Sequence, residues 1–178
     1  VARDPLGAVG EAVEGEGVLR LGAGEFAAEK LRITRPVRIE GVPGLTMLKT
    51  ALVIEGTGDV SLSGLSFAGK GDDVLVSATD ARDIAIDNCR FMGGGRGLVL
   101  ERCSGAVRAS VFRDQRDAAL FALDSNGLEI SSNTVSDIGA NGIMVWTSEK
   151  REDGTLVCNI RISHIASIPG DTGQTGNG

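Results

Sequence analysis

The chain has 178 residues, a formal net charge of −6 and a pI near 4.8. Its Lys and Arg residues are scattered among acidic ones, whereas a nucleic-acid-binding surface needs a cationic stripe that neutralises phosphates. No apolar run approaches the roughly 18 residues that a membrane span requires. We therefore expect a single domain over residues 1–178 that has no nucleic-acid partner and no membrane span.

The composition is unusual in its 26 Gly, its lack of Tyr and its aromatic content of only 3%. Abundant Gly without a collagen period suits many tight turns. There is one His and no C-x-x-C pair among the three Cys residues, so a zinc site has almost no basis. The sequence thus predicts no metal or cofactor, and buried, unreactive thiols.

Residues 1–50 are interpreted as an N-terminal cap followed by the first coils. Residues 4–14 can form a short amphipathic helix, with Asp4 as its cap and Pro5 in its first turn. Residues 17–21 are predicted to form a strand, and segments 31–33 and 37–39 contain apolar residues in the alternating pattern of half-buried strands. A cap of this kind covers the first open coil of a solenoid.

Residues 51–178 contain an apolar phrase that returns about every 22–24 positions. It occupies residues 60–67, 84–91, 107–112 and 128–135, and a second phrase keeps step with it at 52–54, 74–76, 98–100, 120–122 and 143–145. A fixed period of this length indicates a solenoid. Each coil has room for three short strands, for example 74–77, 83–87 and 90–91, separated by Gly-rich turns.

Period-2 alternation predicts which side chains of the first strand in each coil face the core. The expected inward residues are Leu52, Ile54, Val74, Val76, Leu98, Leu100, Ile143 and Val145. The expected outward residues form one row of Val53, Leu75, Val99, Phe121 and Met144, and a second row of Glu55, Ser77, Glu101, Leu123 and Trp146.

One position of the repeat, held by Cys89, Ser110 and Asn133, falls at a tight bend between the second and third strands. An Asn at this position either hydrogen-bonds backbone groups of the bend or tolerates a left-handed conformation. At the end of the chain, residues 173–178 resemble 139–142, which lead straight into a strand. We therefore expect further coils beyond residue 178.

Leucine-rich repeats are an alternative to the β-helix, because Leu128, Ile130 and Asn133 fit their strand-plus-Asn pattern. A leucine-rich repeat would use the rest of its period for a helix or a 3₁₀ segment. This chain instead passes through Gly-rich turns into another strand phrase, such as residues 97–100. The pattern favours an all-β fold, a right-handed parallel β-helix.

The segment Gly17-Val18-Leu19-Arg20-Leu21-Gly22-Ala23-Gly24-Glu25-Phe26 resembles the first strand and turn of the pectin-lyase-like superfamily of right-handed parallel β-helices. More narrowly, residues 141–150 together with Glu152-Asp153-Gly154-Thr155 resemble an uncharacterised bacterial family with repeats of roughly 23 residues. Proteins of that family are exported by the twin-arginine route. The resemblance covers the chain from residue 17 onward and implies a periplasmic or secreted location, but no particular activity.

The strongest enzymatic lead is Asp72 and Asp73, within Gly71-Asp72-Asp73-Val74-Leu75-Val76. This segment resembles the paired-Asp motif of polygalacturonases, and two carboxylates beside a glycosidic bond are what its hydrolysis requires. That family places a Gly-His-Gly turn one coil later, where this chain has Gly95-Arg96-Gly97. Because its other motifs are also missing here, the two Asp residues fit turn positions as well.

The second lead is the outward face of the first strands, where an apolar stripe marks a contact surface. Such a surface is either covered by a further part of the chain or forms a groove for an extended polymer or a protein partner. Phe121, Met144 and Trp146 are the candidate binding residues, with Glu101 and Asp124 as the nearest carboxylates. The charged run 149–154 lengthens the coil that follows Trp146, and such insertions form loops on one face of a repeat protein.

Two functions follow from these leads. The first is an exported envelope protein that binds a polysaccharide or a protein partner on this face, or supports the envelope structurally. The second is a polysaccharide hydrolase or lyase of the pectin-lyase-like type. The sequence leaves the oligomeric state open.

Overall fold

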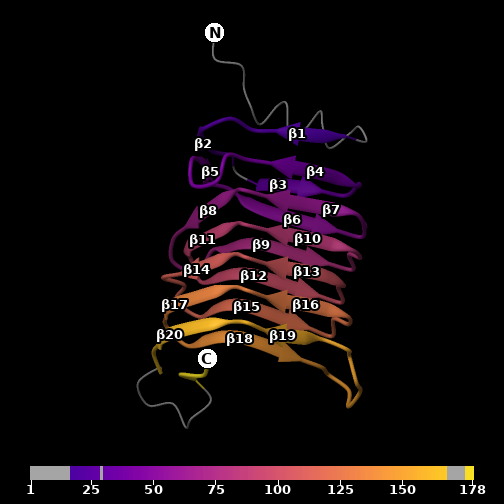
Figure 1. Cartoon of the computed structure of the whole chain (residues 1–178), viewed down its shortest axis with the longest axis vertical. Coiled ribbons are helices and arrows are strands. Elements are labelled where there is room, and N and C mark those ends of the chain that lie inside the picture. Colours follow the sequence, from indigo (N-terminus) through magenta and orange to yellow (C-terminus); the bar gives the residue numbers. More distant parts are fainter. Residues whose placement is uncertain (1–16, 29, 168–174) are drawn as a thin grey trace.

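The computed structural model describes residues 17–28, 30–167 and 175–178. The helix predicted over residues 4–14 lies outside these residues. The described part is an all-β parallel solenoid, as predicted, in which successive coils stack from β1 at the N-terminal end to β18, β19 and β20 at the other (Figure 1). Each coil contributes one short strand to each of three parallel sheets, which we call A, B and C.

Sheets A and B each contain seven strands. The strands of sheet A, in spatial order, are β1 (Val18–Arg20), β4 (Val37–Glu40), β7 (Val60–Ser63), β10 (Ile84–Asp87), β13 (Gly105–Arg108), β16 (Leu128–Ser131) and β19 (Leu156–Cys158). Those of sheet B are β2 (Gly24–Phe26), β5 (Thr46–Leu48), β8 (Ser66–Gly69), β11 (Arg90–Gly93), β14 (Val111–Arg113), β17 (Thr134–Ile138) and β20 (Arg161–Ile165).

Sheet C contains six strands and corresponds to the second apolar phrase of the repeat, which forms the first strand of each coil. Its strands are β3 (Lys30–Ile33), β6 (Ala51–Glu55), β9 (Val74–Thr79), β12 (Arg96–Glu101), β15 (Ala118–Leu123) and β18 (Asn141–Trp146). Beyond β20, Asn177 forms an isolated parallel bridge with Asn141, the first residue of β18. Between β18 and β19 the chain makes a longer excursion over residues 147–155 (Figure 1).

The core is a set of ladders in which equivalent residues of successive coils lie on top of one another. In sheet B the rings of Phe67, Phe91 and Phe112 stack, with centroids 5.1 and 4.5 Å apart. All three Phe side chains are almost fully buried. In-register parallel pairing places like residues at this spacing because neighbouring strands are about 4.8 Å apart. One continuous core therefore runs along the solenoid axis.

The bend between sheets A and B is held by a buried polar ladder. The backbone N–H of Cys89 donates to Ser110 Oγ (3.1 Å), and the backbone N–H of Ser110 donates to Asn133 Oδ1 (2.9 Å). Asn133 Nδ2 in turn donates to the carbonyl of Val107 (2.9 Å). The left-handed conformation belongs to the preceding residue of each bend, for example Ser132 with φ of 57°. Of the two roles considered for Asn133, backbone hydrogen bonding is thus the one observed.

The register of sheet C corrects the prediction for β9. Val76 pairs with Leu52 and Leu98, and Ala78 faces the core beside it. Leu75, expected to point outward, is only 3% exposed. Its side chain packs closely against Gly69 at the corner, where a Cβ added to that glycine would lie only 2.4 Å from Leu75 Cδ2.

The same register moves the other residues of β9. Val74, expected inward, is half-buried and pairs with Arg96. Ser77 takes the place expected for Leu75 in the first outward row, and Thr79 takes the place expected for Ser77 in the second. Hydrogen bonding to both neighbouring strands sets this register, and alternation within β9 alone does not reveal it.

Candidate functional site

The outward face of sheet C carries two rows of side chains that run along the solenoid axis. The first row is Val53, Ser77, Val99, Phe121 and Met144, and the second is Glu55, Thr79, Glu101, Leu123 and Trp146. Three of the four residues in the N-terminal half of these rows are polar, namely Ser77, Glu55 and Thr79. The C-terminal half forms what we call the apolar patch: Val99, Phe121, Leu123, Met144 and Trp146.

Trp146 is the most prominent member of the apolar patch, with 60% of its surface exposed. Its ring meets that of Phe121 edge to face, with centroids 6.3 Å apart and an interplanar angle of 72°. The guanidinium of Arg96 lies over the Phe121 ring, 5.1 Å from its centroid. Such contacts hold aromatic rings in defined orientations. The structure thus brings the predicted residues Phe121, Met144 and Trp146 together on one face.

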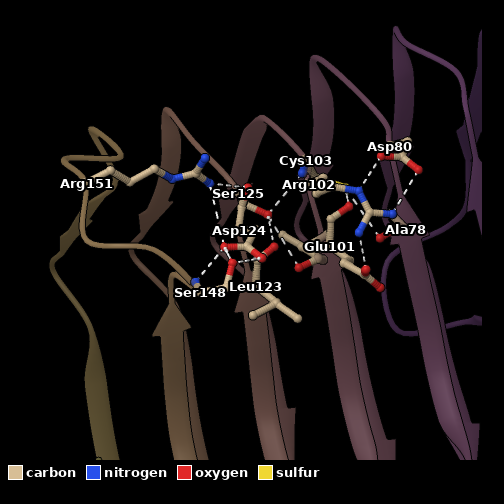
Figure 2. Close-up of polar contacts among 11 residues, drawn as sticks. Ala78, Asp80, Glu101, Arg102, Cys103, Leu123, Asp124, Ser125, Ser148 and Arg151 are labelled. Atoms are coloured by element: carbon tan, nitrogen blue, oxygen red, sulfur yellow. Dashed lines mark hydrogen bonds and ion pairs between the residues drawn. The ribbon is translucent and has the colours of Figure 1, made fainter.

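Glu101 and Asp124 lie where the sheet C strands end and the chain turns toward sheet A. At this corner Arg102 adopts a left-handed backbone conformation, with φ of 52°. Its guanidinium donates to both carboxylate oxygens of Asp80, at 2.6 and 3.0 Å, and also contacts the carboxylate of Glu101 (Figure 2). The hydrogen bonds to Asp80 and Glu101 raise the pKa of Arg102, and the bond from Arg102 lowers that of Asp80. The Glu101 carboxylate is therefore engaged by a neighbouring cation.

Asp124 anchors the loop of residues 147–155. Its Oδ1 accepts hydrogen bonds from the backbone N–H (2.7 Å) and the hydroxyl (2.8 Å) of Ser148, and the hydroxyl also lies 2.8 Å from Oδ2. The guanidinium of Arg151 donates to the Asp124 carbonyl (2.5 Å), as Figure 2 shows. The bonds from Ser148 lower the pKa of Asp124. The loop is thereby attached close to Trp146, which it follows in the chain.

A groove of about 790 Å³ lies at the corner between sheets B and C. Its charged lining residues are Asp72, Arg96, Arg116 and Asp117. Arg116 forms an ion pair with Asp72, and Arg96 Nε donates to Asp117 Oδ2 at 2.5 Å. Since Arg96 also covers Phe121, the groove and the apolar patch meet at this side chain.

The two Asp residues of the polygalacturonase-like segment differ in their surroundings. Asp72 lines the groove, and its carboxylate pairs with Arg116, which lies two coils further along the solenoid. The carboxylate of Asp73 instead accepts a hydrogen bond from the backbone N–H of Lys70 (2.8 Å), which closes a local turn. Sequence reasoning did not single out Arg116 or Asp117 for this groove. The repeat period could have indicated that Asp117 is a neighbour of Arg96, since it lies 21 residues further along the chain, close to one coil.

The described residues include no cluster of three or more His, Cys, Asp or Glu side chains suited to a metal ion. Cys89 and Cys103 are buried, as predicted, whereas the prediction is wrong for Cys158, which is partly exposed. Burial raises the pKa of the Cys89 thiol to about 12 and also raises that of Cys103. Within residues 17–28, 30–167 and 175–178, no helix has the length and apolar character needed to cross a membrane.

Residues 39–162 match the family model described as the right-handed β-helix region. The chain belongs to this family, which establishes the hand of the solenoid. No curated protein matches the sequence.

Three solved structures are similar to this chain to different degrees. A candidate glycosyl hydrolase from Parabacteroides merdae ATCC 43184 has a TM-score of 0.66 and 11% identity, with 87% of this chain and 83% of that chain covered. A pectin methylesterase variant in complex with a hexasaccharide has a TM-score of 0.40 and 12% identity, with 75% and 60% covered. The ORF18 protein of Geobacillus virus E2 has a TM-score of 0.43 and 14% identity, with 90% and 37% covered. The first of these likenesses, at 11% identity, shows the fold alone.

Proposed function

We propose that this protein is an exported, polysaccharide-binding β-helix protein of the cell envelope. The observation that carries the proposal is the apolar patch, in which Trp146 stands exposed beside Phe121 and Met144 on a sheet that otherwise faces solvent. The likeness to a candidate glycosyl hydrolase supports a carbohydrate ligand. The export route rests on the family resemblance of residues 141–155.

The geometry of the patch suits an extended chain of sugars. Equivalent residues of successive coils lie about 4.8 Å apart along the solenoid axis. A linear glycan laid along this axis would place one ring after another over the side chains of Val99, Phe121 and Met144. The apolar C–H faces of the sugars would pack on these side chains and on Trp146, while Ser77 and Thr79 could bond their hydroxyl groups.

The charged groups around the patch favour binding over hydrolysis. Glycoside hydrolysis needs one protonated carboxylic acid and a second carboxylate acting as base or nucleophile. The carboxylates near the patch are instead engaged by donors: Asp72 by Arg116, Asp117 by Arg96, Glu101 by Arg102 and Asp124 by Ser148. For Asp124, the bonds from Ser148 lower the pKa and so favour the charged carboxylate, which is the wrong form for a general acid.

A glycan-binding array followed by titration of the best ligand tests the proposal. We expect Trp146→Ala to weaken binding about 30-fold, corresponding to the roughly 2 kcal/mol of a central aromatic contact. Leu156→Ala is the matched control, because Leu156 is 55% exposed but belongs to β19 of sheet A. Equal affinities for the Trp146→Ala variant and the wild type would contradict a binding site on the patch.

A polysaccharide hydrolase or lyase is the second candidate, because the groove holds two carboxylates, Asp72 and Asp117, which lie two coils apart. Release of new reducing ends from a bound glycan would identify an enzyme. Activity lost in Asp72→Ala but kept in Asp73→Ala would place the chemistry in the groove. Binding without new reducing ends supports a receptor or structural role. Fractionation of the producing cells checks the proposed export.

A further inference from the structure

We infer that the glycan recognised by the apolar patch is uncharged. This inference rests on the proposed function and names the class of its ligand. The long-range field of the protein disfavours an acidic ligand, because the formal net charge of −6 repels a polyanion such as a polyuronate or a sulfated glycan. An acidic glycan would therefore need local cations that are free to receive its carboxylates or sulfates.

The guanidinium groups that border the patch are already paired with carboxylates of this chain. Arg96 is bonded to Asp117 at 2.5 Å, on the side of the groove. Arg102 is held between Asp80 and Glu101 at the opposite corner. An incoming anion would have to replace these carboxylates, so it would gain little net electrostatic energy.

The same pairing continues at both ends of the face. On the N-terminal side, Arg32 Nη1 lies 2.7 Å from Glu55 Oε2. On the C-terminal side, Arg151 binds the carbonyl of Asp124 and lies 3.9 Å from its carboxylate. The loop segment 149–153, Glu-Lys-Arg-Glu-Asp, has three acidic and two basic residues and so adds one net negative charge. The surroundings of the patch thus offer no excess of positive charge.

An uncharged glycan meets none of these obstacles. Its hydroxyl groups can donate to the paired carboxylates and accept from the guanidinium N–H groups without breaking an ion pair. Its apolar ring faces can cover the exposed surface of Trp146 and the half-buried side chains of Phe121 and Met144. The chemistry of the face therefore matches hydroxyl groups and C–H surfaces, not fixed negative charge.

Matched pairs of glycans that share a backbone but differ in charge test this inference. One pair is hydroxyethylcellulose and carboxymethylcellulose, and the other is fully methyl-esterified polygalacturonate and polygalacturonate itself. Affinity electrophoresis and calorimetric titration of the full chain would compare both members of each pair at about 0.05 M and about 0.5 M salt. We expect the uncharged member of at least one pair to bind about tenfold more tightly, with an affinity that salt leaves unchanged.

Tighter, salt-sensitive binding of the acidic members would overturn the inference and leave the proposed function standing. If none of the four glycans binds, the best ligand of the glycan array is compared at the same two salt concentrations, and an acidic, salt-sensitive ligand would overturn this inference. The absence of any array ligand would overturn the proposed function, and this inference with it. A variant separates the electrostatic effect from the effect of the shape of the patch. Asp117→Asn removes the carboxylate that pairs with Arg96, and we expect this variant to bind the acidic member of each pair more tightly than the wild type does at low salt. No gain in this variant would overturn the role assigned to the paired guanidinium groups.

Discussion

The buried bend ladder between sheets A and B allows a stability prediction that can be worked out from single hydrogen bonds. Asn133 is 1% exposed, and its amide accepts from the backbone N–H of Ser110 and donates to the carbonyl of Val107. Asn133→Ala leaves the Ser110 N–H buried without an acceptor, at a cost of about 1–3 kcal/mol. The second lost hydrogen bond adds about 1 kcal/mol.

We therefore expect Asn133→Ala to lower the free energy of unfolding by about 2–4 kcal/mol. With a urea slope of about 2 kcal/mol/M, the unfolding midpoint should fall by about 1–2 M. Urea titrations followed by far-UV circular dichroism measure this shift. The matched control is Asn126→Ala, because Asn126 lies exposed in a turn, and its replacement should change stability by no more than about 0.5 kcal/mol.

A second variant separates hydrogen bonding from backbone conformation. The left-handed residue of this bend is Ser132, not Asn133. Asn133→Gly should therefore cost at least as much as Asn133→Ala, because glycine supplies neither the acceptor nor the donor. If Asn133→Gly were as stable as the wild type, the ladder would not be the source of the stability of this bend, and the reasoning would be refuted.

Two further predictions concern the loop and the thiols. Hydrogen bonds from Ser148 lower the pKa of the Asp124 carboxyl from its ordinary value of 3.8. They therefore attach the loop of residues 147–155 while Asp124 is charged, and they are lost as the pH falls through the folded-state pKa. Trp146 fluorescence should therefore change only below pH 3.8. The Asp124→Asn variant should lack that change, and trypsin should cleave its loop faster at neutral pH. A fluorescence titration of the variant identical to that of the wild type would contradict this prediction. Burial should protect Cys89 and Cys103 from a thiol reagent in the folded protein, whereas Cys158 reacts. Mass spectrometry of the labelled peptides checks this order, and early labelling of Cys89 would be inconsistent with the packed core.

The sequence by itself determined the architecture, because a solenoid is built from local, repeated information. The return of apolar phrases every 22–24 residues predicts the coils, and Gly-rich turns divide each coil into three strands. Period-2 alternation correctly places Leu52, Leu98 and Leu100 in the core. It also correctly places Phe121 and Trp146 on the outer face.

The tertiary structure decided the relations between coils, which alternation within one strand does not contain. Leu75 is buried because its strand takes the register of its neighbours and because glycines leave room at the corner. Asp72 and Asp73 are adjacent in the chain, yet one pairs with Arg116 and the other closes a turn with Lys70. Which atoms meet at a corner depends on the direction of the backbone there, and this direction follows from the packing of adjacent coils.

The same physical reason explains which parts of the candidate site were predictable. Phe121, Met144 and Trp146 follow from the repeat, because equivalent positions of successive coils stack in register. The attachment of the loop to Asp124 and the pairing of Arg96 with Asp117 depend on side chains that reach from one coil to the next. The repeat period indicates which residues can become neighbours, and only the folded corners determine which of them bond.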